Sequence, residues 1–122
     1  MGEETTPMTG GCLCGAIRYE LSEPPSGGAT CHCRTCQRHS GSAFTAIAAF
    51  PRSALRYTKG EPKLYRSSSI LERGFCRDCG SPVVNRYLVP LGELKLSNPD
   101  MVWVPIGTLD EPEAATIAII TA

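Results

Sequence analysis

The chain has 122 residues, and its 12 lysines and arginines balance its 12 aspartates and glutamates, which gives a formal net charge of zero. This length fits one domain, and the charge pattern gives no sign of a nucleic-acid-binding surface. No apolar run approaches the ~20 residues that a membrane-spanning helix needs. No charged-then-apolar leader opens the sequence either. We therefore expect a cytoplasmic protein that binds neither nucleic acid nor membrane.

The first part of the sequence predicts a tail, a strand and a loop. We expect residues 1–9 to form a flexible, polar N-terminal tail and residues 10–122 to form a single domain. Apolar and polar residues alternate between positions 15 and 21, which predicts a half-buried strand. The prolines and glycines of residues 23–28 predict a loop after it.

The rest of the chain is predicted to be a series of short strands. A helical turn is expected at residues 37–40, ending at Gly41. Apolar segments bounded by glycine or proline predict strands at 43–50, 55–58, 64–68, 70–75, 82–88 and 102–106. Ten prolines and twelve glycines suit many short strands better than long helices. The fold class is therefore mostly β, with short antiparallel strands and zinc supplementing a small core.

Seven cysteines stand in three clusters, and their spacing indicates metal binding. The clusters are Cys12-x-Cys14, Cys31-x-Cys33-x-x-Cys36 and Cys76-x-x-Cys79. Their odd number argues against a framework of disulfides alone, and a reducing cytosol favours metal sites. Four thiolates close a tetrahedral structural zinc site, whereas three leave a coordination position free, as in catalytic zinc sites. The count therefore predicts two zinc ions, one structural and one catalytic.

Two of the clusters are pairs that can each grip one ion. In extended backbone Cys12 and Cys14 face the same side. Cys76 and Cys79 form a tight knuckle, in which Gly80 can adopt a positive φ that turns backbone N–H groups toward sulfur. Sharing one ion would join chain segments 62 positions apart. Spacing alone also allows the first pair to join Cys33 and Cys36, and iron, as a four-iron cluster, is the alternative to zinc.

The middle cluster supplies three ligands from one short segment. His32 lies between two cysteines, so in extended backbone its ring points away from their ion; we interpret it as a supporting or solvent-facing residue, with a ligand role as the alternative. His39 follows Cys36 on the same helical face. It is either a surface histidine or a group that orients a ligand or exchanges a proton.

Several motifs together resemble the glutathione-dependent formaldehyde-activating enzyme family, also called centromere-protein-V-like. They are Gly11-Cys12-Leu13-Cys14-Gly15, the Cys31–Cys36 cluster with Gly41-Ser42, Ser67-Ser68, Arg73-Gly74-Phe75-Cys76-Arg77-Asp78-Cys79-Gly80-Ser81-Pro82 and Gly107-Thr108-Leu109-Asp110. The resemblance runs from about residue 10 to residue 112. Similar chains continue with an aromatic and histidine-bearing tail, whereas residues 116–122 read TIAIITA here.

The resemblance implies an all-β "β-tent" fold, a structural zinc and a catalytic zinc. By motif position, the structural ion would be held by Cys12, Cys14, Cys76 and Cys79, and the catalytic ion by Cys31, Cys33 and Cys36. The implied activity joins glutathione and formaldehyde into S-hydroxymethylglutathione, a reaction classed with carbon–sulfur lyases. The expected partners are therefore a small-molecule thiol such as glutathione and a small aldehyde.

Other residues near the clusters have two interpretations each. Four arginines could pair with carboxylates of a glutathione-like ligand or be ordinary surface charges, namely Arg34, Arg38, Arg73 and Arg77. Ser67 and Ser68 donate hydrogen bonds near the site or simply end a strand. The alternative function is a non-catalytic zinc-binding interaction module or a thiol or zinc sensor. A fourth protein ligand such as His32 or His39 would favour the module.

Overall fold

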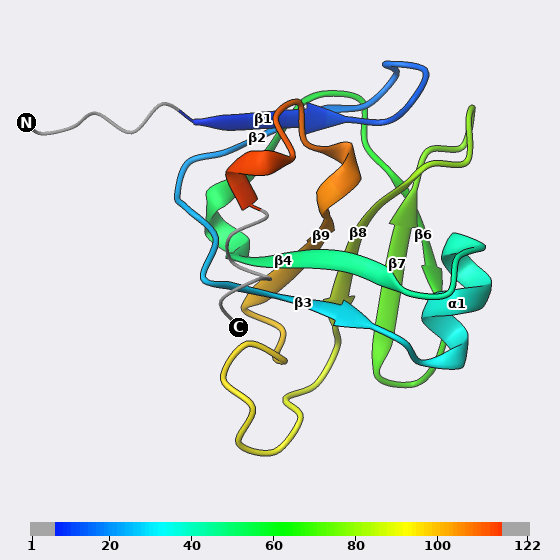
Figure 1. Ribbon diagram of the computed structural model, residues 1–122, viewed down its shortest axis with the longest axis vertical. Coiled ribbons are helices and arrows are strands. Elements are labelled where there is room, and N and C mark those ends of the chain that lie inside the picture. Colours follow the sequence, from blue (N-terminus) through cyan, green and yellow to red (C-terminus); the bar gives the residue numbers. More distant parts are fainter. Residues whose placement is uncertain (1–6, 116–122) are drawn as a thin grey trace, which may run out of the picture.

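The computed structural model describes residues 7–115, whose strands form two antiparallel sheets (Figure 1). The smaller sheet has the strand order β1-β2-β5, and the larger has the order β3-β4-β9-β8-β7-β6. The strands are β1 (Met8–Gly11), β2 (Arg18–Leu21), β3 (Gly27–Cys31), β4 (Thr45–Pro51), β5 (Leu55–Lys59), β6 (Lys63–Arg66), β7 (Leu71–Phe75), β8 (Pro82–Tyr87) and β9 (Met101–Pro105). The helices are α1 (Arg34–Ser40) and the 3-10 turns η1 (Arg52–Ala54) and η2 (Ile106–Thr108).

The prediction of a mostly β fold with short antiparallel strands is confirmed. Six of the predicted strands match β2, β4, β5, β7, β8 and β9 with shifted ends, and the strand predicted at 64–68 is β6. The first of them begins at Arg18 instead of residue 15, because Gly15 has a φ of 84° and lies in a turn. The helical turn predicted at 37–40 is the second half of α1, and Gly41 ends it in the left-handed conformation.

Two strands were not expected from the sequence. Met8 and Thr9 belong to β1, although we expected a tail there; residues 1–6 lie outside the described residues. Residues 27–31 form β3, although the loop was expected to extend through residue 28. Gly27 and Gly28 pair with Ala49 and Ala48 of β4. Glycine suits this edge because a Cβ at position 27 would lie 2.8 Å from Leu96 Cδ1.

The main core is built from both sheets. Tyr19 and Leu21 of β2 are buried with Phe50 of β4 and with the valines of β8 and β9. Each such side chain contributes roughly 1.5–3 kcal/mol by leaving water. The Tyr19 hydroxyl also hydrogen-bonds Thr108 Oγ1 at 2.6 Å, which ties β2 to η2. This core therefore holds the two sheets together near the first and last cysteine clusters.

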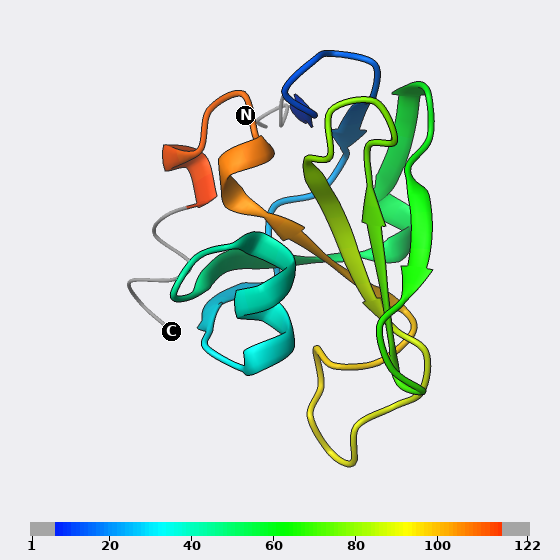
Figure 2. The ribbon, with the colours of Figure 1, turned by 90° about the vertical axis from the view of Figure 1, so that its right-hand side faces the viewer.

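One face of the larger sheet carries the buried polar residues Arg73 and Asn85. Arg73, Asn85 and Trp103 are cross-strand partners on β7, β8 and β9, so their side chains share one face. Figure 2 shows α1 on one side of β7 and β8, and Arg73 reaches Thr35 and Cys36 of this helix. The helix therefore covers the Arg73 face. Within residues 7–115, no helix has the length and hydropathy needed to span a membrane.

Candidate metal centres

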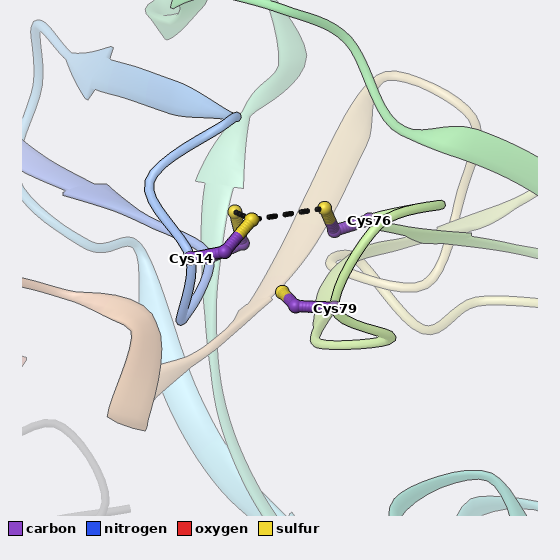
Figure 3. A group of neighbouring side chains, drawn as sticks. Cys14, Cys76 and Cys79 are labelled. Atoms are coloured by element: carbon purple, nitrogen blue, oxygen red, sulfur yellow. Dashed lines mark hydrogen bonds between the residues drawn. The ribbon is translucent and has the colours of Figure 1, made fainter.

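Four cysteine sulfurs from two distant loops converge at one end of the molecule. Cys12 and Cys14 follow β1, whereas Cys76 and Cys79 follow β7, and their sulfur atoms all lie within 4.8 Å of one another. The Cys12 and Cys14 sulfurs are 3.7 Å apart, and those of Cys14 and Cys76 are 3.8 Å apart. Figure 3 shows Cys14, Cys76 and Cys79 pointing toward one another from the two loops.

Backbone and serine donors surround these sulfurs. The N–H groups of Ile17 and Asp78 donate to Cys12 Sγ and Cys76 Sγ at 3.3 and 3.4 Å. Gly80 has the positive φ, 79°, that this knuckle was expected to need. The Ser81 hydroxyl lies 3.1 Å from Cys79 Sγ and, as the main cause, lowers the pKa of Cys79 to about 5. These hydrogen bonds favour the thiolate of Cys79, and, against burial, the Ile17 N–H lowers the pKa of Cys12. The backbone hydrogen bond of Ala16 lowers the pKa of Cys14, but burial and the neighbouring sulfurs outweigh it and raise this pKa to about 12.

The other three cysteines gather where β3 leads into α1. Cys31 ends β3, Cys33 is the N-cap of α1 and Cys36 lies in its first turn. Their sulfurs also lie within 4.8 Å of one another, with 3.5 Å between those of Cys31 and Cys33. Cys33 Sγ accepts the Cys36 N–H, so the ligand side chain also caps the helix. Cys33 is exposed, whereas Cys36 is only 6% exposed.

A buried arginine lies against the innermost of these sulfurs. Arg73 is 2% exposed, and its two terminal nitrogens lie 3.7 and 3.6 Å from Cys36 Sγ. Its Nε donates to Ser67 Oγ at 3.1 Å, and one terminal nitrogen donates to Thr35 Oγ1 at 3.0 Å. Sequence reasoning placed Arg73 only near the clusters. In the sequence, Arg73 lies two positions from Leu71 and from Phe75, a spacing that predicts one shared face of β7. Only the position of α1 shows that this face is covered.

The three thiols experience different electrostatic environments. The Thr35 hydroxyl, 3.3 Å from Cys33 Sγ, is the largest cause that lowers the pKa of Cys33 to about 6. Burial, followed by the contacts with Cys31 and Cys33, raises the pKa of Cys36 to about 12, while Arg73 opposes this rise. Three crowded thiols cannot all ionise unaided, whereas a divalent cation among them would stabilise all three thiolates.

The two histidines do not join either sulfur group. His32 is exposed, its ring stacks on Phe44 with 5.4 Å between ring centroids, and its Nε2 lies 3.2 Å from Thr30 Oγ1. This agrees with a ring that points away from the sulfurs. His39 is half-buried, and its Nε2 is buried without a hydrogen-bond partner in the described structure. It therefore differs from an ordinary surface histidine, and burial lowers its pKa.

Both sulfur groups fit a thiolate-bound zinc ion. With zinc–sulfur bonds of about 2.3 Å, sulfurs at the corners of a tetrahedron lie about 3.8 Å apart. The sulfur–sulfur distances of 3.5–3.8 Å in the two sites match this spacing, and all seven cysteines are free thiols. Thiolates also select zinc or iron over magnesium and calcium. Cys12 and Cys14 join Cys76 and Cys79, and not Cys33 and Cys36, so the pairing that spacing left open is decided.

These features define a small antiparallel β protein with two candidate thiolate metal centres. The chain matches the family described as glutathione-dependent formaldehyde-activating enzyme over residues 7–119, and it belongs to that family. The resemblance inferred from the motifs is thereby confirmed.

Individual relatives agree with this assignment. An uncharacterized lyase of Schizosaccharomyces pombe is 35% identical over 80 residues, which are 64% of this chain and 56% of the relative. A protein of Phaeosphaeria nodorum, whose name places it provisionally in the same family, is 29% identical over 79 residues, or 63% and 42% of the two chains. The matched segment thus spans about half the length of these curated relatives.

A solved structure has a similar fold. The crystal structure of a Rhodobacter sphaeroides protein superimposes with a TM-score of 0.65 and 27% identity. The match covers 84% of this chain and 88% of the other. The family is therefore shown by the sequence match, and the fold is shared with a solved structure.

Proposed function

We propose that this protein is a zinc-dependent carbon–sulfur lyase that acts on a thiol–aldehyde adduct of the S-hydroxymethylglutathione type. The observation that carries the proposal is the three-sulfur group of Cys31, Cys33 and Cys36, which is one ligand short of a closed tetrahedral site. The name of the family supplies glutathione and formaldehyde as the substrate pair. The site's exposure supports the same conclusion, because Cys33 is open to solvent.

The proposed roles divide the cysteines between two ions. Cys12, Cys14, Cys76 and Cys79 would hold a structural zinc, and Cys31, Cys33 and Cys36 would hold the catalytic one. When bound at the three-cysteine site, zinc would stabilise a thiolate and act as a Lewis acid toward an aldehyde oxygen. The reaction forms one bond from the thiol sulfur to the aldehyde carbon, and the thiol proton ends on the aldehyde oxygen. It needs no oxidant or reductant.

The chain's own residues would orient the reactants. Arg34 and Arg38 lie on α1 with exposed side chains, so they remain candidates to pair with the carboxylates of a glutathione-like thiol. Arg77 lies beside the four-cysteine site, and Arg73 is buried, so neither is available at the solvent face of the three-cysteine site. His32 and Phe44 form an exposed ring pair next to Cys31 and Cys33, which would border the entering substrate.

The alternative is a zinc-binding interaction module or a thiol sensor. Such a module is favoured by a fourth protein ligand, but no histidine, aspartate or glutamate of residues 7–115 joins the three sulfurs. His32 instead contacts Thr30 and Phe44. The structure therefore gives the enzyme more support than the module.

The test is to mix zinc-loaded protein with glutathione and formaldehyde and to measure hemithioacetal exchange by NMR. We expect faster exchange with the unaltered protein and only the uncatalysed rate with Cys33→Ala, which loses an exposed ligand and keeps the four-cysteine site. The matched control is Ser53→Ala, an exposed substitution on η1. No acceleration at stoichiometric protein would remove the proposed reaction.

A further inference from the structure

Arg73 carries a buried positive charge. It is 2% exposed, and a guanidinium removed from water is costly unless an opposite charge lies beside it. The ion pairs within residues 7–115 involve Arg18, Arg56 and Arg86, so no described carboxylate balances Arg73. Its side-chain hydrogen-bond partners within residues 7–115 are two neutral hydroxyl groups and one sulfur, those of Ser67, Thr35 and Cys36.

The sulfur is therefore the group that can balance the charge. Both terminal nitrogens of Arg73 reach the same Cys36 Sγ, at 3.7 and 3.6 Å. Cys36 is itself buried, so water does not substitute for this contact. A thiolate accepts such charge-assisted hydrogen bonds far better than a thiol does.

Thr35 extends the arginine's influence to a second sulfur. Because Arg73 can only donate, the Thr35 oxygen must accept its hydrogen bond at 3.0 Å. The single Thr35 hydroxyl proton is then free to point to Cys33 Sγ, 3.3 Å away. Ser67 Oγ accepts a further hydrogen bond from Nε of the same guanidinium. The guanidinium thus contacts Cys36 Sγ directly and orients the Thr35 hydroxyl toward Cys33 Sγ.

We propose that Arg73 is the positioning residue and internal counter-charge of the three-cysteine site. Three thiolates and one Zn²⁺ carry a net charge of minus one, which Arg73 brings to zero. The arginine approaches from the protein side, at buried Cys36, and leaves the side of exposed Cys33 to an incoming thiol. The inference rests on the proposed metal occupancy of this site but not on the proposed reaction.

This role replaces the interpretation of Arg73 as a residue that recognises substrate carboxylates. Its guanidinium is committed to Ser67, Thr35 and Cys36 inside the protein. Hydrogen bonds to ligand atoms from outside the coordination shell typically change metal affinity by about 10–100-fold when removed. The predicted consequence of losing Arg73 is therefore weaker metal binding at one site only.

The experiment titrates the zinc-loaded full chain with a competing chelator and counts the ions that remain. In the unaltered protein we expect two ions released in separate steps. In Arg73→Met the first ion should leave at an about 10-fold or more lower chelator concentration, with the second step unchanged. Arg73→Lys, which keeps the charge but loses the fork, should fall between them. Arg66→Met, at an exposed arginine of β6, should match the unaltered protein.

A second measurement separates charge balance from simple packing. In a Cys36→Ala background the guanidinium loses its counter-charge, so adding Arg73→Met should raise the melting temperature there while lowering it in the unaltered background. Equal losses in both backgrounds, unfolding included, would overturn the proposal. Retention of both ions by Arg73→Met at the chelator concentrations of the unaltered protein would do the same.

These readouts need no turnover. A protein that shows Arg73-dependent zinc retention but no hemithioacetal exchange would contradict the proposed reaction alone. A protein that accelerates exchange, with zinc retention unaffected by Arg73→Met, would contradict the role of Arg73 alone.

Discussion

The two cysteine groups differ in how far apart their residues lie along the chain. The four-cysteine group joins loops separated by 62 positions between Cys14 and Cys76, whereas the three-cysteine group comes from the six residues 31–36. An ion in the first group would connect β1 to β7 and close a long loop. An ion in the second would bind a segment that β3 and α1 already order. We therefore expect an ion in the first group to stabilise the fold and an ion in the second to exchange ligands.

The largest effect should come from breaking the group that joins distant segments. In Cys76→Ala we expect loss of the ion and cooperative unfolding at 25 °C. Zinc binding contributes about 10–16 kcal/mol in small zinc domains, against a typical domain stability of about 5–15 kcal/mol. Circular dichroism and zinc content measure the two losses. A folded Cys76→Ala protein with an unchanged melting temperature would contradict the structural role.

The matched substitution in the local group should spare the fold. Cys33→Ala removes an exposed thiol that caps a helix of seven residues. We expect one zinc ion to be lost and the fold to persist, because β3 and α1 already order this segment; the lost N-cap itself accounts for about 1 kcal/mol. Denaturant unfolding with zinc analysis tests both statements. A global collapse would show that the two groups share the structural role.

A smaller effect should follow from removing a hydrogen bond to the four-cysteine group. Ser81 lowers the pKa of Cys79 to about 5, so in Ser81→Ala this pKa should rise and the thiolate should take up its proton at a higher pH. Zinc release during acid titration should therefore begin at a higher pH, with an affinity loss of about tenfold near neutrality. The control is Ser53→Ala, which should release zinc as the unaltered protein does. An unshifted release profile would show that Ser81 does not tune this site.

The smallest effect should come from the exposed ion pair beside that group. Arg18 and Thr9 hold Asp110, and their hydrogen bonds, that of Arg18 being the stronger, lower its pKa. The carboxylate therefore adds stability at neutral pH that is lost as pH falls through this lowered pKa. Because Arg18 and Asp110 are partly exposed, Asp110→Asn should cost less than about 1 kcal/mol. Denaturant unfolding at pH 7, in low and in high salt, should show a small loss that shrinks as salt screens the exposed pair. A large loss at pH 7 would mean that surface charge, more than metal, holds this end.

The sequence was most informative where the chemistry is local. The cysteine spacings and the alternation before Leu21 depend on residues close together, and they predicted the three cysteine clusters and the strand β2. The sequence was less informative for β1 and β3. Their own residues show little strand alternation, and they form strands by pairing with residues of β2 and β4 such as Leu21 and Ala49. Glycine-rich edge strands have little periodicity of their own to detect.

Arg73 shows most clearly what tertiary structure added. By sequence it was one of four arginines near cysteines, equivalent to Arg34, Arg38 and Arg77. The register of β7 against β8 and the position of α1 then buried it against Cys36. The tertiary structure likewise buries His39 Nε2 and Asn85 Oδ1 without a hydrogen-bond partner in the described residues, which the sequence did not indicate.

Residue types and their spacing were enough to determine the family, the mostly β class and the seven candidate ligands, because ligand chemistry and strand alternation act over a few residues. Which arginine is buried and which thiol faces solvent were decided only by the fold. The fold also brought Cys12 and Cys14 to Cys76 and Cys79, a grouping that spacing left open and the family resemblance implied. Those properties depend on distances between segments tens of residues apart, and packing of the two sheets and α1 sets these distances.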